Sequence, residues 1–214
     1  MRPGTALLAS SCLLAACSGT VSDDATSGDT STDSAPVAVA PIASPSERNA
    51  FFGDLHVHTR NSYDAFVFGT RADPDAAYEF AKGNAIAHPA GFELQLDRPL
   101  DFQMVADHAN YLGMLPAMTD PDSPAYDHPV AETVRTAETV AERGGIFAAM
   151  QPYVRFMSDA DPSIREHLNM DVVRSAWSET IAAANRHNVP GTFTAFIGYE
   201  YTSAGSGGVY ANLH

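Results

Sequence analysis

The sequence predicts an α/β fold, in which the strands of one sheet alternate with helices. Three apolar runs, at residues 49–58, 100–106 and 193–198, have the length and composition of strands. A helix-start signal, Asp73 followed by Pro74, lies between the first two runs. Because functional groups gather where the strands of parallel α/β sheets end, we expect the polar residues that follow these runs to meet at one edge.

The composition is acidic and excludes one large class of partner. The 214 residues carry 12 Lys and Arg against 26 Asp and Glu, a formal net charge of −14. Nucleic-acid-binding proteins use clustered basic side chains to neutralise phosphates, and here the arginines are scattered, so nucleic acid is not expected as a partner. The length suits one domain with a substantial core. The oligomeric state stays open.

The N-terminus has the features of a bacterial export signal. Residues 1–17 contain an arginine and a short apolar run, and they end in Leu14-Ala15-Ala16-Cys17, which resembles a lipobox. This resemblance implies lipidation of Cys17 and contact with a membrane through the N-terminal lipid anchor. Because Ser18 stands where an aspartate would favour the inner membrane, we expect the bacterial cell envelope, at the outer membrane facing the periplasm or the outside. An ordinary cleaved secretory signal is the alternative.

A tether is expected between the signal and the domain. Residues 18–46 are rich in Ser, Thr, Asp, Ala and Pro and show no apolar periodicity, so they cannot form a core. The domain is then expected at residues 47–214. Both cysteines, Cys12 and Cys17, precede it, so it has neither a disulfide nor a thiolate ligand.

The first strand ends in a histidine pair within FFGDLHVHT. In a strand, His56 and His58 point to the same side, and neutral imidazole is a common metal ligand. Two polar residues at the mouth of a core strand are the alternative reading. A loop, TRNSYDAFVFGTRA, is expected next and carries Asp64, and a helix is expected from the N-cap Asp73 to Gly83 as the C′ residue.

The second strand follows an irregular segment, residues 84–99, and ends in Asp107-His108. Adjacent strand residues face opposite sides. One of this pair is therefore expected to face the site and the other to support it from behind, as carboxylates support metal-binding histidines.

A helical block at about residues 115–188 separates the second and third strands and is expected to pack over the strand ends as a cap. The expected elements are a loop at 111–129, helices at 129–143 and 146–157 separated by Gly144-Gly145, and a helix from Asp161-Pro162. An apolar stripe in the last helix is expected to be core rather than a ligand platform: Val173, Trp177, Ile181 and Ala184.

Glu200 follows the third strand, and a turn at 203–208 is expected before a fourth strand at 209–213. Since the sequence ends on this apolar strand and His214, we expect it to be the N-terminal part of a longer protein.

The polar residues at the strand ends predict a metal site. Two or three histidines with Asp64 and Glu200 give a nitrogen and oxygen ligand set that suits Zn, Mn or Fe better than Ca or Mg. A bridging Glu200 would hold two ions about 4 Å apart, an arrangement used to hydrolyse phosphoesters with metal-bound hydroxide.

Four segments, GDLHVHTRNSYD, FQMVADH, FIGYEYT and NLH, resemble in order the motifs of the polymerase and histidinol phosphatase (PHP) superfamily, and especially a branch of large secreted bacterial proteins of unassigned function. The resemblance implies the N-terminal part of a distorted (β/α)7 barrel with a helical insertion, holding two or three divalent transition metals. The family's later ligands, another histidine and an Asp-x-His motif, have no counterpart here. The implied metal ligands are His56, His58, Asp64, His108, Glu200 and His214, and the implied catalytic residues are Glu200 and Asp107.

We therefore expect a metal-dependent hydrolase, a phosphoesterase acting on a small-molecule or other anionic substrate. Two alternatives stay open: the site hydrolyses amide, ester or sulfate-ester bonds, or the chain is a non-catalytic, lipid-anchored binding protein. Three arginines are candidates for an anion clamp, although a surface role is expected of each: Arg60, Arg71 and Arg98. The other histidines are expected to be ordinary surface or interface residues: His88, His128, His167 and His187.

Overall fold

The computed structural model describes residues 49–155, 166–204 and 210–213. The chain from Arg48 onward forms one compact unit. Some expectations concern residues outside the described ones: the signal 1–17 with Cys17, the tether 18–46, the helix start at Asp161-Pro162, and His214.

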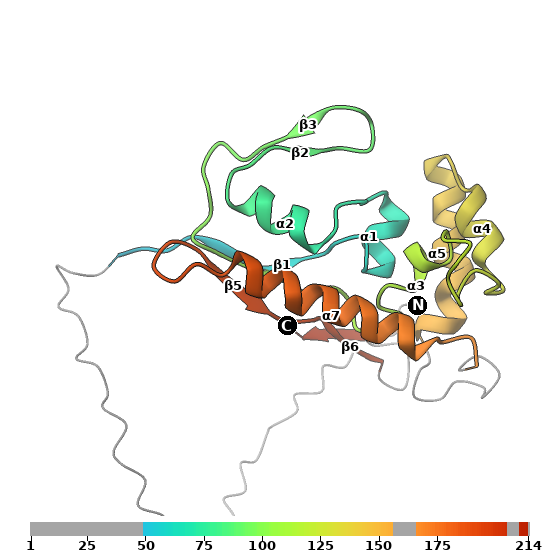
Figure 1. Cartoon of the computed structure of the whole chain (residues 1–214). Coiled ribbons are helices and arrows are strands. Elements are labelled where there is room, and N and C mark those ends of the chain that lie inside the picture. The colour runs from blue at the N-terminus through green and yellow to red at the C-terminus, as the bar shows by residue number, and fades with distance from the viewer. Residues whose placement is uncertain (1–48, 156–165, 205–209, 214) are drawn as a thin grey trace, which may run out of the picture. The chain divides into compact units, whose positions relative to one another are not determined.

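A parallel sheet of three strands is the centre of the unit (Figure 1). It contains β1 (Gly53–Val57), β4 (Phe102–Val105) and β5 (Thr194–Ile197), in that order. All three strands predicted from the apolar runs are present, and the α/β class is confirmed. The described strands do not close into a barrel, so the PHP-type barrel stays a prediction.

Two short antiparallel pairs accompany the parallel sheet. β2 (Ile86–Ala87) and β3 (Glu93–Leu94) form a hairpin inside the segment for which the sequence predicts irregular structure. β6 (Tyr201–Ala204) pairs with β7 (Tyr210–Leu213), the predicted fourth strand. The turn predicted at 203–208 is wrong at its start, because Ser203 and Ala204 pair with β7 as part of β6.

Helix α2 (Pro74–Ala81) begins and ends as the sequence predicts. The carboxylate of Asp73 accepts a hydrogen bond from the amide of Ala76 at 2.8 Å, and Pro74 is the first helical residue. Gly83 follows the C-cap residue with a φ of 83°, a left-handed conformation that favours glycine.

The segment after the histidine pair is a helix, not the loop that the sequence predicts. α1 (Tyr63–Phe68) has Ser62 as its N-cap residue. It buries Phe66 and Val67 against other helices, and this packing, more than local propensity, explains why so short a helix forms. As a result, Asp64 lies in the first turn of a helix.

The described residues between β4 and β5 contain four helices: α3 (Met114–Ala117), α4 (Ala131–Thr136), α5 (Val140–Arg155) and α7 (Met170–His187). The helix predicted at 129–143 is wrong in its end, since α4 stops at Thr136. The stop predicted at Gly144-Gly145 is also wrong, because α5 continues through both glycines and buries Ile146 and Met150. No helix in the described ranges is long and apolar enough to cross a membrane.

The helices form two hydrophobic cores. One lies between α2, α7 and the sheet, and Tyr78, Val105 and Ala183 belong to it. The other joins α1, α3, α4 and α5, with Met114 and Ile146 among its fully buried residues. The expectation of one cap at residues 115–188 is therefore wrong in part, because α7 packs on α2, β4 and β5 as a layer of the sheet domain (Figure 1).

The apolar stripe predicted on α7 is only partly buried. Ala184 is buried, whereas Val173, Trp177 and Ile181 are half-buried. Small side chains on the buried face let α7 pack closely on α2, and of the larger residues in the stripe Val173 packs against the second core. The buried residues of α7 are Ala176, Thr180, Ala183, Ala184 and His187.

Candidate metal centre

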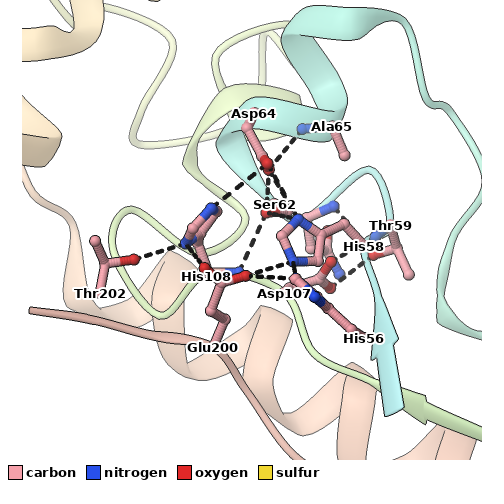
Figure 2. A network of polar contacts seen from close by, with 11 residues as sticks. His56, His58, Thr59, Ser62, Asp64, Ala65, Asp107, His108, Glu200 and Thr202 are labelled. Carbon is pink, nitrogen blue, oxygen red and sulfur yellow. Dashed lines mark hydrogen bonds and ion pairs between the residues drawn. The ribbon is translucent and has the colours of Figure 1, made fainter. Parts of the chain in front are cut away.

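The ends of the three parallel strands bring four of the predicted residues together (Figure 2). His56 lies in β1 and His58 directly after it, while His108 and Glu200 follow β4 and β5. A parallel bridge between His108 and Glu200 continues the pairing beyond the strands, and the amide of Glu200 donates to the carbonyl of Asp107 at 3.0 Å. The meeting of these strand ends at one edge of the sheet, which the sequence predicts, is therefore what assembles the site.

Three potential ligand atoms form the tightest group in the site. Nε2 of His56 and Nε2 of His58 lie 2.9 and 2.7 Å from Oε2 of Glu200, and 3.1 Å from each other. The side chain of Glu200 is fully buried, that of His58 is 15% exposed and that of His56 is 50% exposed. The group is thus open to solvent on the side of His56.

This group fits a metal ion. Suppose that Nε2 of both histidines carries a proton and donates to Glu200; the two N–H groups then repel each other. If only one Nε2 carries a proton, the lone pair of the other Nε2 faces the carboxylate of Glu200, which is also unfavourable. A divalent cation removes this conflict, since ligand atoms about 2.1 Å from an ion lie about 3.0 Å apart at octahedral angles and about 3.4 Å apart at tetrahedral angles. In addition, Oε1 of Glu200 is buried and accepts no hydrogen bond from the described residues. The two imidazole nitrogens and the carboxylate oxygen form a group that could hold a metal ion.

Asp64 forms a second group with His58 and His108. Both of its carboxylate oxygens lie 3.1 Å from Nδ1 of His58, and Oδ2 lies 3.5 Å from Nε2 of His108. The first turn of α1 holds this carboxylate in place, because the amide of Ala65 and the hydroxyl of Ser62 donate to Oδ1 at 2.7 and 2.5 Å.

His58 belongs to both groups, through opposite ring nitrogens. Nε2 faces Glu200 and Nδ1 faces Asp64. A neutral imidazole has one nitrogen with a free lone pair and one that carries a proton. His58 can therefore bind an ion in only one group, and its other nitrogen then donates a hydrogen bond.

The electrostatics of the site keep Asp64 ionised. Burial raises the pKa of Asp64, but hydrogen bonds from His108, His58 and Ser62 outweigh burial and hold this pKa well below its usual range. For His58, burial lowers the pKa, yet the hydrogen bond with Asp64 and the charges of the neighbouring carboxylates raise it overall. The raised pKa of His58 reflects the negative charge of the neighbouring carboxylates.

The part of the chain that the structure describes supplies no lysine or arginine to this site. The ion-pair partners of Asp64 and Glu200 are histidines only. Buried carboxylates are costly unless they are paired or coordinate a metal, so a cation between the histidines and Glu200 would complete the charge balance.

Asp107 does not stand behind His108 as the sequence predicts. Its two oxygens accept hydrogen bonds from the amide and the hydroxyl of Thr59, at 2.5 and 2.7 Å. These bonds join the end of β4 to the residue after His58. Burial raises the pKa of Asp107 to about 6, although the hydrogen bonds from Thr59 oppose that rise.

Three hydroxyl side chains to which the sequence assigns no role hold the site together. Oγ1 of Thr202 lies 2.8 Å from Nδ1 of His108, which fixes the ring and directs Nε2 toward Asp64. Ser62 bonds Asp64 and accepts from the amide of His108 at 3.1 Å, while Thr59 holds Asp107. Thr202 follows Glu200 by two residues in extended chain, so both side chains point to the same side of the strand. This spacing is a sequence signal from which the supporting role of Thr202 could be predicted. No comparable signal marks Ser62 or Thr59.

The four histidines expected to be surface or interface residues lie apart from this centre, and two of them are not on the surface. His128 is 7% exposed within the second helical core, and His187 is 8% exposed, with Nε2 2.9 Å from Asp75. Packing between helices buries both rings. His88 is half-buried, and His167 is exposed.

A family model described as "Protein of unknown function (DUF3604)" matches residues 45–214 of the chain, which include every residue that the structure describes. No curated protein and no solved structure matches the chain.

Proposed function

This chain belongs to the DUF3604 family, whose function is unknown, and we propose that it is a metal-dependent hydrolase with a phosphoester as its substrate. The observation that carries the proposal is the convergence of His56, His58 and Glu200, whose ligand atoms lie between 2.7 and 3.1 Å apart. A buried carboxylate held between two imidazoles, with no basic side chain beside it in the described ranges, is chemistry that a divalent cation completes.

In this proposal, His56 and His58 would hold the ion through Nε2, and Glu200 would hold it through Oε2. Asp64 then accepts a hydrogen bond from Nδ1 of His58, which fixes the ring and makes Nε2 a stronger ligand. The side chain of His56 is 50% exposed, so a substrate would reach the group at this residue. An ion held there supplies Lewis acidity, which polarises a phosphoryl oxygen and makes water a stronger nucleophile near neutral pH.

A second ion is part of the proposal and depends on the free oxygen of Glu200. Oε1 accepts no hydrogen bond from the described residues and lies 3.4 Å from Nδ1 of His108. His108 also presents Nε2 to Asp64, at 3.5 Å from Oδ2. Oε2 of Glu200 belongs to the first group, and the free Oε1 is a donor that Glu200 would offer to a second ion, as the two- or three-metal sites implied by the resemblance to the PHP superfamily require. Paired ions favour displacement at phosphorus.

Metal content is the first test. The full chain, purified without chelator, should contain at least one Zn, Mn or Fe per molecule. Glu200→Gln keeps the shape of the side chain but removes its charge, and should lose the metal. Glu132→Gln, in which the replaced side chain is 76% exposed on α4, should keep it. A wild-type chain without stoichiometric transition metal would remove the basis of the proposal.

Activity on a panel of substrates is the second test. The metal-loaded chain should hydrolyse small phosphomonoesters or phosphodiesters in preference to sulfate esters, carboxylic esters and amides. Glu200→Gln should abolish turnover, whereas Glu132→Gln should not change it. If the chain hydrolyses only another class of ester, the proposal of a hydrolase stands but the proposed phosphoester substrate is wrong. Loaded metal with no turnover on any class would favour a binding protein.

We propose in addition that the enzyme is anchored to the bacterial outer membrane through lipidated Cys17. The support is the sequence Leu14-Ala15-Ala16-Cys17 followed by Ser18. Expression in a bacterial host should place the wild-type chain in the membrane fraction with a mass increase on Cys17, and Cys17→Ser should release it or leave its signal uncleaved. An unmodified wild-type cysteine would contradict this part of the proposal.

A further inference from the structure

We propose that the cavity between the end of α1 and the β2–β3 hairpin binds a small organic oxyanion, in which a phosphate, sulfate or carboxylate is attached to an apolar or aromatic group. Arg71 and Arg143 hold the anionic end. This site is separate from the metal centre and does not depend on the proposed hydrolase activity.

Arg71 lines the cavity and has N–H donors that no described residue accepts. Its Nη1 donates to the carbonyls of Phe66 and Thr70, each at 2.8 Å, and its guanidinium lies 3.8 Å from the centre of the Phe66 ring. A guanidinium has five N–H donors, and these contacts use those of one nitrogen. They fix the group rigidly and leave the remaining nitrogens for a ligand.

Arg143 reaches the same cavity from α5. Its Nη1 lies beside Gly69, where an added Cβ would be 3.0 Å away, so the absence of a side chain at Gly69 allows this approach. The charge of Arg143, after burial, is a cause of the lowered pKa of Arg71, which shows that the two guanidinium groups act on each other. An anion between or beside them would relieve this repulsion.

These two arginines differ from others in the chain. Among the described residues, Arg60, Arg135, Arg174 and Arg186 each form an ion pair with a carboxylate, whereas Arg71, Arg98 and Arg143 do not. Of these three, Arg71 and Arg143 line one cavity, and Arg98 does not. The chain has 26 acidic residues against 12 basic ones, so carboxylate partners are abundant. Two neighbouring arginines without one are therefore a positive site in an acidic protein, and Arg is well suited to planar recognition of oxyanions.

The cavity also has the size and walls of a ligand site. Its volume is about 540 Å³, within the range of small-molecule pockets. Phe68, Ile86 and Leu94 line it with apolar surface, and Phe68 is 79% exposed. Figure 1 shows the hairpin above α2, with its turn near α1. An aromatic or aliphatic group on the anion would cover these side chains, which is why we propose an organic anion rather than an inorganic one.

Calorimetric titration of phenylphosphonate into the full chain tests this site. The titration is done with chelator present, so that the metal centre cannot contribute. Wild type should bind, and Arg143→Gln and Arg71→Gln should each weaken binding about tenfold or more, as expected for the loss of a charge-assisted hydrogen bond. Arg174→Gln removes the same charge from an exposed position on α7 and should leave the dissociation constant unchanged.

Two further comparisons make the result decisive. Glu200→Gln should bind phenylphosphonate as wild type does, because the metal centre takes no part. Inorganic phosphate should bind more weakly than phenylphosphonate, because it lacks the apolar group. Equal affinity in wild type and Arg143→Gln, or equal affinity for both ligands, would overturn the proposal. Circular dichroism spectra that match wild type confirm that the variants are folded.

Discussion

Both carboxylate oxygens of Asp64 lie 3.1 Å from Nδ1 of His58, on the side of the ring opposite to the contact with Glu200. A carboxylate in this position keeps the proton on Nδ1, so Nε2 presents its lone pair toward His56 and Glu200. In a metal-free chain that lone pair of a neutral His58 would face the Glu200 oxygen at 2.7 Å, which is unfavourable, and the raised pKa of His58 shows that a proton is the cation favoured there when no metal is bound. The contact between Asp64 and His58 thus prepares the first group for a cation.

Asp64→Asn should weaken metal binding without abolishing it. The amide cannot accept the Nδ1 proton with the same strength, so the His58 ring loses orientation and basicity. Loss of such a supporting carboxylate typically costs 10- to 100-fold in metal affinity. Titration of Zn²⁺ into the metal-free chain should show that decrease with an unchanged stoichiometry.

The matched control is Asp171→Asn, since Asp171 is exposed on α7 and pairs only with Arg174 among the described residues. Its affinity for Zn²⁺ should equal that of wild type. If Asp64→Asn instead lowers the number of ions bound, Asp64 is itself a ligand, as the sequence resemblance implies. If it changes neither quantity, the role assigned to the Asp64–His58 contact is wrong.

Metal binding should stabilise the fold through Glu200. A ligand that binds only the folded state at about 100 times its dissociation constant adds about 2.7 kcal/mol to the free energy of unfolding. Calorimetric melting should therefore show a higher midpoint with Zn²⁺ than with chelator in wild type, and no such difference in Glu200→Gln.

The same melting experiment gives a second result in chelator. There, Glu200→Gln should be at least as stable as wild type, because a neutral amide replaces a buried carboxylate that lacks a cation. A large loss of stability in chelator would show that the carboxylate is paired within the metal-free fold. Glu132→Gln should follow wild type in both conditions.

The sequence predicts the strand-end residues of the site well, because each strand is recognised from a local run of apolar residues. The residues that follow parallel strands then meet at one edge of the sheet. His56, His58, His108 and Glu200 meet for this reason. The role of Asp64 is not visible in the sequence, because it depends on α1, a six-residue helix that tertiary packing stabilises. The same holds for Asp107, whose partner Thr59 belongs to another strand end.

Protonation of His128 should destabilise the fold in mild acid. Burial and then the charge of His167 lower the pKa of His128 to about 4, and Nδ1 accepts a hydrogen bond from the amide of Val130. In the unfolded chain a histidine titrates near 6.5. The unfolded chain therefore binds more protons between these values, and the stabilisation present above pH 6.5 is lost as pH falls toward 4.

Urea unfolding at pH 7.5 and pH 4.5 measures this effect. The difference in unfolding free energy between the two pH values should be smaller in His128→Asn than in wild type by about 2 kcal/mol. His88→Asn, at a half-buried position in the hairpin, should behave as wild type. An equal acid loss in His128→Asn and wild type would exclude His128 as its cause.

Gly145→Ala should stabilise the protein, because α5 runs through Gly144-Gly145 instead of stopping there. A Cβ at either glycine meets no atom within 4 Å, so the added methyl group costs no packing. Alanine in a helix interior is favoured over glycine by about 0.5–1 kcal/mol, and urea unfolding should show an increase of that size in the free energy of unfolding.

Gly113→Ala is the opposite case, since the φ of Gly113 is 72° and a Cβ there would lie 2.5 Å from Cβ of Ala176. It should destabilise the protein. If Gly145→Ala destabilises as well, the helix breaks at the glycine pair, as the sequence alone predicts, and the burial of Ile146 and Met150 does not outweigh the local preference.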